Sequence, residues 1–413
     1  MQNNGQNQLA IKYSNQSAIR KMIYLEGPVL RSAIADSLQL TLPTITTNIV
    51  KLINTGVVFN DKDAIVSTSG RSAQPVNIVA DSRYFIGIEI TTRVRELYLV
   101  DYRGSIVYQA ADQTHLTAYD AVIQSAARLI IDAFLSESIS RDKIYGIGVS
   151  MPGLIDSENG MLLAHRQYDW YNKTVVSDLR TLMASTLQNK GKDSDRLLSY
   201  NGPITLGNDA YARSLATQLF MRKELADIPS FLYLYVSTGI AAPYVRNDHS
   251  LSAANIGAGE LGYMIMDAHA GFGSYGCLGS LNTVAGERVL KKNYAKIKGL
   301  PQDYDSSYIP VTQIIEDSKS NPEIEELVKT TCFYLGIAVA NEDNLVRPSS
   351  ILVDAEYFTD TTYRNYFADT IKKYSFRPND FEFQFIYIDR NYINGPRSAA
   401  ALAIHKDFDS YIE

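Results

Sequence analysis

The sequence predicts an α/β protein in which a small helical N-terminal domain precedes a two-lobed α/β body. Apolar residues recur at helical spacing in three short segments before residue 56. From residue 83 onward, strand-like and helical segments alternate, and this plan occurs twice. The 413 residues are enough for two or three domains with sizeable cores.

Composition and cysteine content narrow the class of protein. Hydrophobic residues make up 46% of the chain, yet no apolar run approaches the roughly 20 residues that a membrane helix needs. The polar N-terminus lacks the apolar stretch of a secretory signal, so we expect a cytoplasmic protein without a membrane partner. The two cysteines, Cys277 and Cys332, exclude a disulfide framework and a four-cysteine zinc site within one chain, and we expect both to be small buried hydrophobes.

Charge is distributed unevenly along the chain. Residues 1–75 carry seven basic and four acidic side chains, a net charge of +3, whereas the whole chain carries −6 and the remainder therefore −9. A basic N-terminal domain on an acidic body suits an anionic partner that contacts the N-terminal domain alone.

The N-terminal domain contains three amphipathic segments, at residues 17–27, 30–40 and 41–56. Two short strand-like runs follow, at residues 57–62 and 64–69, and a turn with Arg71 at its tip closes them. Three helices and a hairpin predict a winged helix-turn-helix domain over residues 1–78. The alternative is a small helical interaction domain.

The third segment is the expected DNA-reading helix. Its apolar stripe, Leu42, Ile45, Ile49, Leu52 and Ile53, predicts which side chains face outward. Short hydroxyl and amide groups can reach base edges or phosphates, and lysine and arginine can neutralise phosphates. The candidate DNA-binding residues are therefore Pro43 in the first turn, Thr44, Thr47, Asn48, Lys51 and Arg71.

The body begins with strand-like runs at 84–90, 95–102 and 104–111, a helix at 118–138 and a strand at 143–156 that ends in a Pro-Gly loop. The same order of strands, helix and strand occurs again, with strands at 230–240 and 242–247, a long helix at 323–346 and a strand at 349–358. Two such halves favour a two-lobed α/β body with a cleft between the lobes.

Short motifs in the body include GIEITTRVRELYLVD, ITLGNDAYARSLA, STGIAAPYV, GAGELGYMIMD, GSYGCLGSLNT and ILVDAEYF. Their order resembles the ROK family of repressors, open reading frames and sugar kinases, over nearly the whole chain. The resemblance implies an actin-like, ribonuclease H-like sugar-kinase fold, and the N-terminal domain matches the regulator branch, which includes xylose and N-acetylglucosamine repressors. It places the first lobe at residues 79–206 plus 395–413 and the second at 207–394.

All three nucleotide motifs of the family are altered in this sequence. Glu89 stands at the position of the first-loop aspartate, and Thr91, Thr92 and Arg93 replace the glycine-rich turn. Ser237 and Ala241 stand at the flanking glycines of the second loop, and Asp354 and Ala355 replace the glycine pair that meets adenosine, where an aspartate should repel a nucleotide. We therefore expect no ATP binding, no catalysis and no cofactor.

The sugar motifs are better preserved. Asn208 and Asp209 match the family's Asn-Asp turn, whose aspartate is the general base in the kinases, although such a pair is also a frequent helix cap. Glu260 remains in the Gly-Glu-x-Gly-His segment, Tyr263 replaces its histidine and Asn282 stands at a family glutamate. These five residues are the candidate sugar site. Trp170 stacks on a carbohydrate or anchors the core.

The family's zinc ligands are one histidine and three cysteines. Aligning the glycines of GSYGCLGSLNT on Gly276 and Gly279 places Tyr263, Gly273, Tyr275 and Ser280 at those four positions. We expect no metal, and a loop in which Tyr263, Tyr275 and Cys277 fill the vacated volume.

These features predict a transcriptional regulator that binds operator DNA, a repressor of carbohydrate metabolism that senses a sugar or sugar derivative in a catalytically inactive cleft. The resemblance and the symmetry of operators imply a homodimer or a dimer of dimers. One alternative is a ROK-type sugar kinase with an atypical nucleotide site. Another is a regulator that has lost its small ligand and responds to a partner protein.

Overall fold

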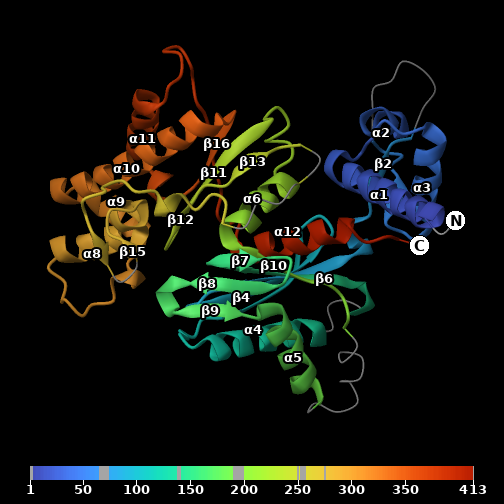
Figure 1. The fold of residues 1–413 in the computed structure, drawn as a ribbon, viewed down its shortest axis with the longest axis horizontal. Helices are drawn as coiled ribbons and strands as arrows, with labels where there is room; N and C mark the ends of the chain where they lie inside the picture. The colour runs from blue at the N-terminus through green and yellow to red at the C-terminus, as the bar shows by residue number, and fades with distance from the viewer. Residues whose placement is uncertain are drawn as a thin grey trace. The chain divides into compact units, whose positions relative to one another are not determined.

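A computed structural model describes residues 3–64, 74–136, 141–188, 200–248, 251, 257–273 and 276–412 (Figure 1). Its contacts divide the chain into two compact units, residues 1–224, 249–251 and 393–413 in the first, and residues 225–248 and 252–392 in the second. No helix in the described ranges is long and apolar enough to cross a membrane.

The N-terminal domain consists of α1 (Asn3–Glu26), α2 (Arg31–Leu38) and α3 (Leu42–Asn54), followed by the antiparallel strands β1 (Val58–Asn60) and β2 (Val76–Ile78). The core of this domain contains Ile19, Ile23, Ile34, Ile45, Ile49 and Leu52, all fully buried. Three helices followed by two antiparallel strands is the element order of a winged helix, and the assignment of residues 1–78 to such a domain stays a prediction.

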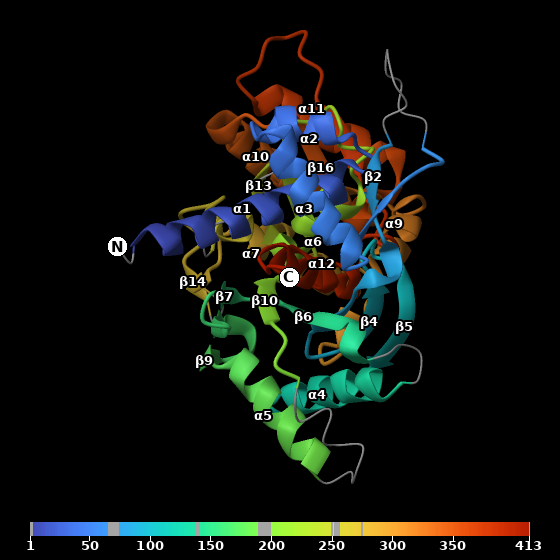
Figure 2. The same ribbon diagram turned by 90° about the vertical axis from the view of Figure 1, so that its right-hand side faces the viewer.

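Two details of the N-terminal domain differ from the expectation. The polar leader is helical from Asn3, and the N-terminal part of α1 extends beyond α2 and α3 (Figure 2). The partner of β1 is Val76–Ile78 rather than residues 64–69, because Phe59 pairs with Asn77 in the register. Residues 65–73, which include Arg71, lie outside the described part of the chain.

The first lobe is built on a five-stranded sheet in the order β10-β6-β3-β4-β5. β6 pairs in parallel with β3 and β10, whereas β4 is antiparallel to β3 and β5. The strands are β3 (Tyr84–Ile90), β4 (Arg95–Asp101), β5 (Ile106–Asp112), β6 (Ile144–Met151) and β10 (Ile204–Asn208). A small antiparallel sheet contains β7 (Leu154–Asp156), β8 (Met161–His165) and β9 (Trp170–Lys173).

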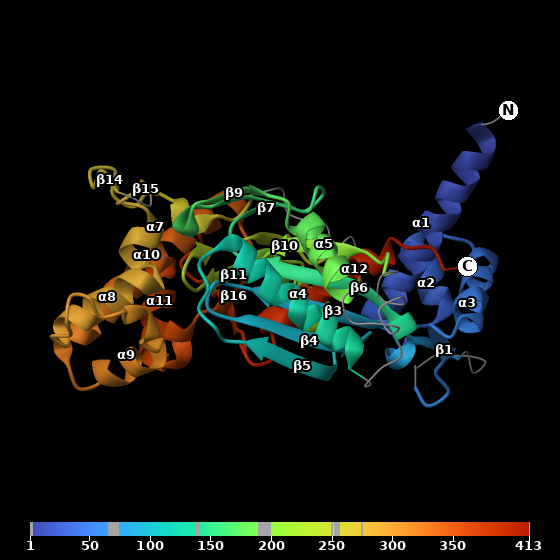
Figure 3. The ribbon, with the colours of Figure 1, turned by 90° about the horizontal axis from the view of Figure 1, so that it is seen from below.

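Helices cover both faces of the five-stranded sheet. On one face, Ile86, Ile88, Ile147 and Val149 share a core with α4 (Tyr119–Leu135), and α5 (Val175–Gln188) packs beside α4 (Figure 3). On the other face, a Cβ at Gly87 or Gly148 would overlap the backbone of α12 (Gly395–Phe408), so these glycines let α12 lie directly on the strands.

The lobe boundary differs from the expected division after residue 206. β10 completes the first sheet through its pairing with β6, and α6 (Asp209–Phe220) packs on α12, so residues 207–224 belong to the first unit. The N-terminal domain also belongs to this unit.

The second unit has a sheet in the order β12-β11-β16-β17, with β13 antiparallel to β11. β16 pairs in parallel with β11 and β17. Its strands are β11 (Ser230–Val236), β12 (Ile240–Ala241), β13 (Tyr244–Arg246), β16 (Ser350–Asp354) and β17 (Gln384–Tyr387), and β14 (Phe272–Gly273) pairs separately with β15 (Gly276–Cys277). Its helices are α7 (Leu281–Ala285), α8 (Glu287–Ile297), α9 (Val311–Ser318), α10 (Pro322–Val346) and α11 (Thr361–Tyr374). As expected, Cys332 is buried, within α10.

Candidate functional site

The outward face of α3 differs in part from the expected one. Asn48 is only 8% exposed, and its amide donates to the Thr44 carbonyl at 2.9 Å, so the expectation that Asn48 faces outward is wrong. Its hydrogen bond within the helix makes its burial possible. Conversely, Leu42, expected in the core, is 50% exposed.

The exposed side chains of α3 are Leu42, Pro43, Thr46, Thr47, Val50 and Asn54. The sequence reasoning missed Thr46 and Val50, although their spacing of four residues places them on one side of the helix. Thr44 is half-buried, and its backbone N–H donates to Thr41, the N-cap, at 3.4 Å. Lys51 is half-buried and donates to the hydroxyl of Tyr411 at 3.5 Å.

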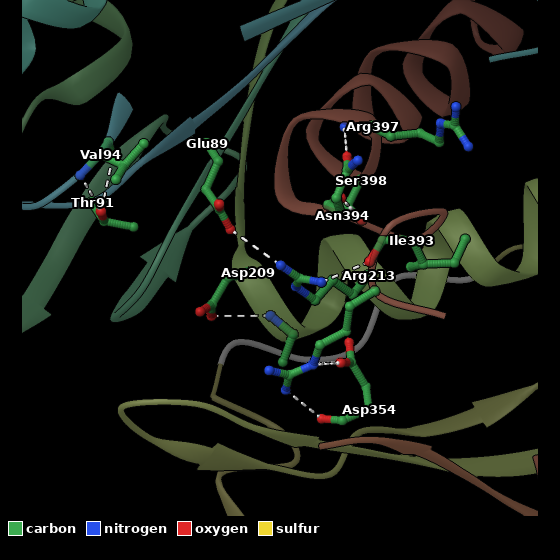
Figure 4. A network of polar contacts seen from close by, with 12 residues as sticks. Glu89, Thr91, Val94, Asp209, Arg213, Asp354, Ile393, Asn394, Arg397 and Ser398 are labelled. Carbon is green, nitrogen blue, oxygen red and sulfur yellow. Dashed lines mark hydrogen bonds and ion pairs between the residues drawn. The ribbon is translucent and has the colours of Figure 1, made fainter. Parts of the chain in front are cut away.

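Glu89, at the position of the first nucleotide loop's aspartate, lies against the start of α12. A Cβ added at Gly395 would overlap its carboxylate, and that carboxylate forms a 3.5 Å ion pair with Arg213 of α6 (Figure 4). The adjacent turn is closed by Thr91, whose hydroxyl donates to the carbonyl of Val94 at 2.8 Å and accepts from its N–H at 3.0 Å. The carboxylate therefore occupies a helix N-terminus, a position that commonly binds anions.

Asp354, in the third nucleotide motif, is completely buried and fully paired in the second unit. Its carboxylate accepts from Arg390 Nε at 2.5 Å and from the Tyr233 hydroxyl at 2.8 Å. Arg390 also donates to the carbonyls of Asp354 and Val236. The charge of Asp354 is therefore balanced by Arg390 within the protein, and its expected repulsion of a nucleotide stays a prediction.

Asn208 and Asp209 lie where β10 passes into α6. Asn208 caps the helix, accepting from the N–H groups of Ala210 at 2.9 Å and Tyr211 at 3.3 Å, while its amide donates to the Gly153 carbonyl at 3.0 Å. Burial, and secondly the nearby charge of Glu89, raise the pKa of Asp209 to about 6. The carboxyl of Asp209 is therefore poised to exchange a proton near neutral pH.

Glu260, Tyr263 and Asn282 lie around one short turn in the second unit. The side-chain oxygen of Asn282 accepts from Ile240 N at 3.0 Å, and its amide lies against Gly262, where a Cβ would overlap it. Tyr263 is 47% exposed, and Glu260 immediately precedes the turn at residues 261–263. Asn282 thus has a structural role in addition to any role toward a ligand.

The sole tryptophan belongs to the core of the first lobe. Trp170 is 5% exposed, and its ring lies 5.6 Å from that of Tyr119 and 5.4 Å from that of His165. Of the two roles weighed for Trp170, this burial favours the core anchor.

The loop at residues 273–283 is closed by main-chain hydrogen bonds. Gly279 O accepts from Met266 N at 2.7 Å and from Asp267 N at 3.0 Å, and Leu281 N donates to Met264 O at 2.9 Å. The exposure of Tyr263 contradicts its expected role as a filler of vacated volume. Tyr275 and the side chain of Cys277 lie outside the described part.

Comparison with protein families identifies the relationship. The model of the ROK family matches residues 85–406. The chain belongs to the ROK family.

Two relatives in sequence are repressors of sugar metabolism by name. The xylose repressor of Bacillus subtilis (strain 168) is 24% identical over 351 residues, which cover 84% of this chain and 83% of the repressor. The N-acetylglucosamine repressor of Escherichia coli O6:H1 is 24% identical over 365 residues, covering 84% of this chain and 81% of the repressor.

Solved ROK structures share the fold. A ROK family transcriptional regulator, a homolog of the Escherichia coli MLC protein, aligns with a TM-score of 0.75 at 19% identity and covers 97% of both chains. The ROK hexokinase of Thermus thermophilus aligns with a TM-score of 0.58 at 17% identity and covers 79% of this chain and 100% of its own.

The residues at the ROK zinc positions do not fit the metal. Tyr263, Gly273, Tyr275 and Ser280 offer no thiolate or imidazole, the groups that structural zinc sites prefer. Backbone hydrogen bonds to Gly279 close the loop instead.

Proposed function

We propose that this protein is a DNA-binding transcriptional regulator, acting as a repressor of carbohydrate metabolism, whose body binds a sugar or sugar derivative. The observation that carries the proposal is the extent of the structural matches. The ROK regulator covers 97% of this chain, whereas the ROK hexokinase covers 79% and leaves about a fifth unmatched. Three helices and a hairpin precede the family's domain, the element order of a DNA-binding winged helix.

The body of this regulator does not transfer phosphate. The Glu89 carboxylate lies where the start of α12 would meet an anion, and Arg390 is engaged with Asp354 and with the Val236 carbonyl. A nucleotide phosphate would have to displace the Glu89 carboxylate from the start of α12 and compete with Asp354 for Arg390.

The proposed carbohydrate-binding residues are those of the retained motifs, Asn208, Asp209, Glu260, Tyr263 and Asn282. Asp209, Glu260 and Tyr263 present carboxyl and hydroxyl groups suited to sugar hydroxyls. The side chains of Asn208 and Asn282 accept backbone hydrogen bonds, so they position the turns that carry the other three.

A signal from Asp209 to the N-terminal domain can pass through α12. The start of α12 lies against Glu89, while Arg213 of α6 donates to the Ile393 carbonyl at 2.7 Å, just before the helix. At the other end, the Asp407 carboxylate contacts Arg20 of α1. We propose that sugar binding shifts α6, α12 and α1 together between two arrangements. This shift would change the free energy of DNA binding by about 1 to 3 kcal/mol.

The test is selection of a duplex by the full-length protein from random DNA, followed by titration of that duplex with and without sugars. Salt-dependent binding to the selected duplex, changed by one sugar that also raises the melting temperature, is the expected result. Failure to enrich any duplex would refute DNA binding. Affinity unchanged by every stabilising sugar would refute the coupling.

The sugar-kinase alternative has a direct test. Incubation with ATP and a panel of hexoses should give no sugar-dependent ADP release, and such release would establish the kinase. No thermal shift with any sugar or sugar phosphate would favour a partner protein as the effector.

We also propose that the protein forms a homodimer or a dimer of dimers. Light scattering measures this oligomeric state directly.

A further inference from the structure

The segment that follows α12 packs against the N-terminal domain. Gln16 of α1 donates to the Ile412 carbonyl at 2.8 Å and accepts from the Ile412 N–H at 2.7 Å. Arg20 of α1 donates to the Ser410 carbonyl at 2.9 Å. Because Gln16 and Arg20 are fully buried, these contacts place the intervening Tyr411 in a defined position.

Tyr411 lies between two lysines of the N-terminal domain. Its hydroxyl accepts from Lys51 Nζ at 3.5 Å, and Lys12 Nζ lies 5.2 Å from the centre of its ring. The ring also packs on Tyr13, with 4.4 Å between the ring centres. Hydrogen bonds and charge from Lys12 and then Lys51 lower the pKa of Tyr411, which reflects the positive potential at this point.

This group lies beside the exposed face of α3. Lys51 follows the exposed Val50, so its side chain projects about 100° further around the helix axis. When a helix lies in the major groove, its outer face meets the bases and its flanks meet the phosphates. Lys51 is thus on a flank, where a phosphate is the expected neighbour.

We propose that Lys12, Lys51 and Tyr411 form a binding site for one backbone phosphate of the DNA duplex. This inference rests on the proposed DNA-binding function. Two ammonium groups neutralise the phosphate and the phenol hydroxyl donates to it, so a residue that follows the ROK domain takes part in DNA binding. The acidic neighbour Asp409 forms an ion pair with Lys406 at 3.2 Å, which reduces its repulsion of the phosphate.

The experiment measures affinity of the full-length protein for its selected duplex and for one unrelated duplex over a range of salt concentrations. The variants are Lys12→Gln, Lys51→Gln and Tyr411→Phe. The control is Lys373→Gln in the second unit, since Lys373 Nζ lies 5.2 Å from the centre of the Tyr374 ring, the same distance as between Lys12 and Tyr411.

Lys12→Gln and Lys51→Gln should each weaken binding to both duplexes. Each should also lower the slope of log affinity against log salt concentration by about 1. Tyr411→Phe keeps the ring and should weaken binding by about threefold to tenfold with little change in that slope. Unchanged melting temperatures separate these effects from misfolding. A Lys12→Gln slope equal to that of Lys373→Gln, or full affinity in Tyr411→Phe, overturns this inference alone. Wild-type protein that binds neither duplex overturns the proposed function as well.

Discussion

Arg20 of α1 and Asp407 of α12 form a buried ion pair, 3.6 Å between Nη1 and Oδ2, that joins the N-terminal domain to the first lobe. Arg83 contacts the other carboxylate oxygen, and the Tyr102 hydroxyl donates to Oδ2 at 2.7 Å. Asp407 is 3% exposed and Arg20 is fully buried. One carboxylate therefore balances two arginines in the interior.

We expect Asp407→Asn to destabilise the protein by about 3 to 5 kcal/mol, because two buried guanidinium groups lose their counter-charge. Urea unfolding gives the free energy. Asp409→Asn, at a surface pair with Lys406, is the control and should cost about 0 to 1 kcal/mol. Equal losses in the two variants would contradict a special role for the buried pair.

The pKa of Asp209 predicts an unusual pH dependence of stability. Because folding raises this pKa from 3.8 to about 6, the neutral carboxyl contributes stability that is present below about pH 4 and lost as the pH rises through about 6. Asp209→Asn cannot ionise, so its free energy of unfolding relative to wild type should increase between about pH 4 and 7, on the order of 2 kcal/mol.

Asp156→Asn is the control for that experiment. Hydrogen bonds from Asn159 lower the pKa of Asp156, so the ionised carboxylate stabilises the wild-type protein and this stabilisation is lost as the pH falls. The free energy of unfolding of Asp156→Asn relative to wild type should therefore decrease as the pH rises, opposite to that of Asp209→Asn. Parallel pH profiles for Asp209→Asn and wild type would show that Asp209 titrates normally.

Arg390 forms an ion pair with Asp354, which the sequence motif predicts to lie at the family's adenosine site. We expect Arg390→Met to destabilise the second unit by about 3 to 5 kcal/mol, because the buried Asp354 would lose the arginine that balances its charge. Thermal melts compare this variant with Lys372→Gln, whose pair with Glu382 is at the surface. ATP should stabilise neither variant, and an ATP-dependent shift in Arg390→Met would show a suppressed nucleotide site.

Two neighbouring residues of α3 should respond in opposite ways to truncation. Thr47→Ala, at an exposed position, should reduce affinity for the selected duplex and leave the melting temperature unchanged. Asn48→Ala removes a buried amide and should cost about 1 kcal/mol of stability. Duplex titration and thermal melts on both variants distinguish the roles, and a change of DNA sequence preference in Asn48→Ala alone would reverse the assignment.

Local periodicity predicted most elements of the fold. The strands β3, β4 and β6 and the helices α4 and α10 lie where alternating or helical apolar patterns placed them. The start of α1 escaped this reasoning because its Asn- and Gln-rich sequence carries no apolar period. The boundary near residue 224 depends on the pairing of β10 with β6, which local sequence does not reveal.

The sequence motifs predicted where the residues of the candidate sites lie along the chain, but not which side chains they contact. The sequence places Glu89 and Asp354 in altered loops, yet Arg213 and Arg390 lie 124 and 36 residues away along the chain. The orientation of Asn48 depended on a hydrogen bond to its own helix, which an apolar stripe does not encode. The proposed contribution of Tyr411 to DNA binding depends on its contact with Lys51, a residue far from it in the sequence.

The closure of the loop at residues 273–283 by the carbonyl of Gly279 has a consequence in the cell. The main-chain hydrogen bonds that Gly279 and Leu281 form with residues 264–267 need no bound ion, so we expect a chelator to leave this part of the protein folded. On the proposed function, we expect regulation by this protein to continue unchanged during zinc starvation.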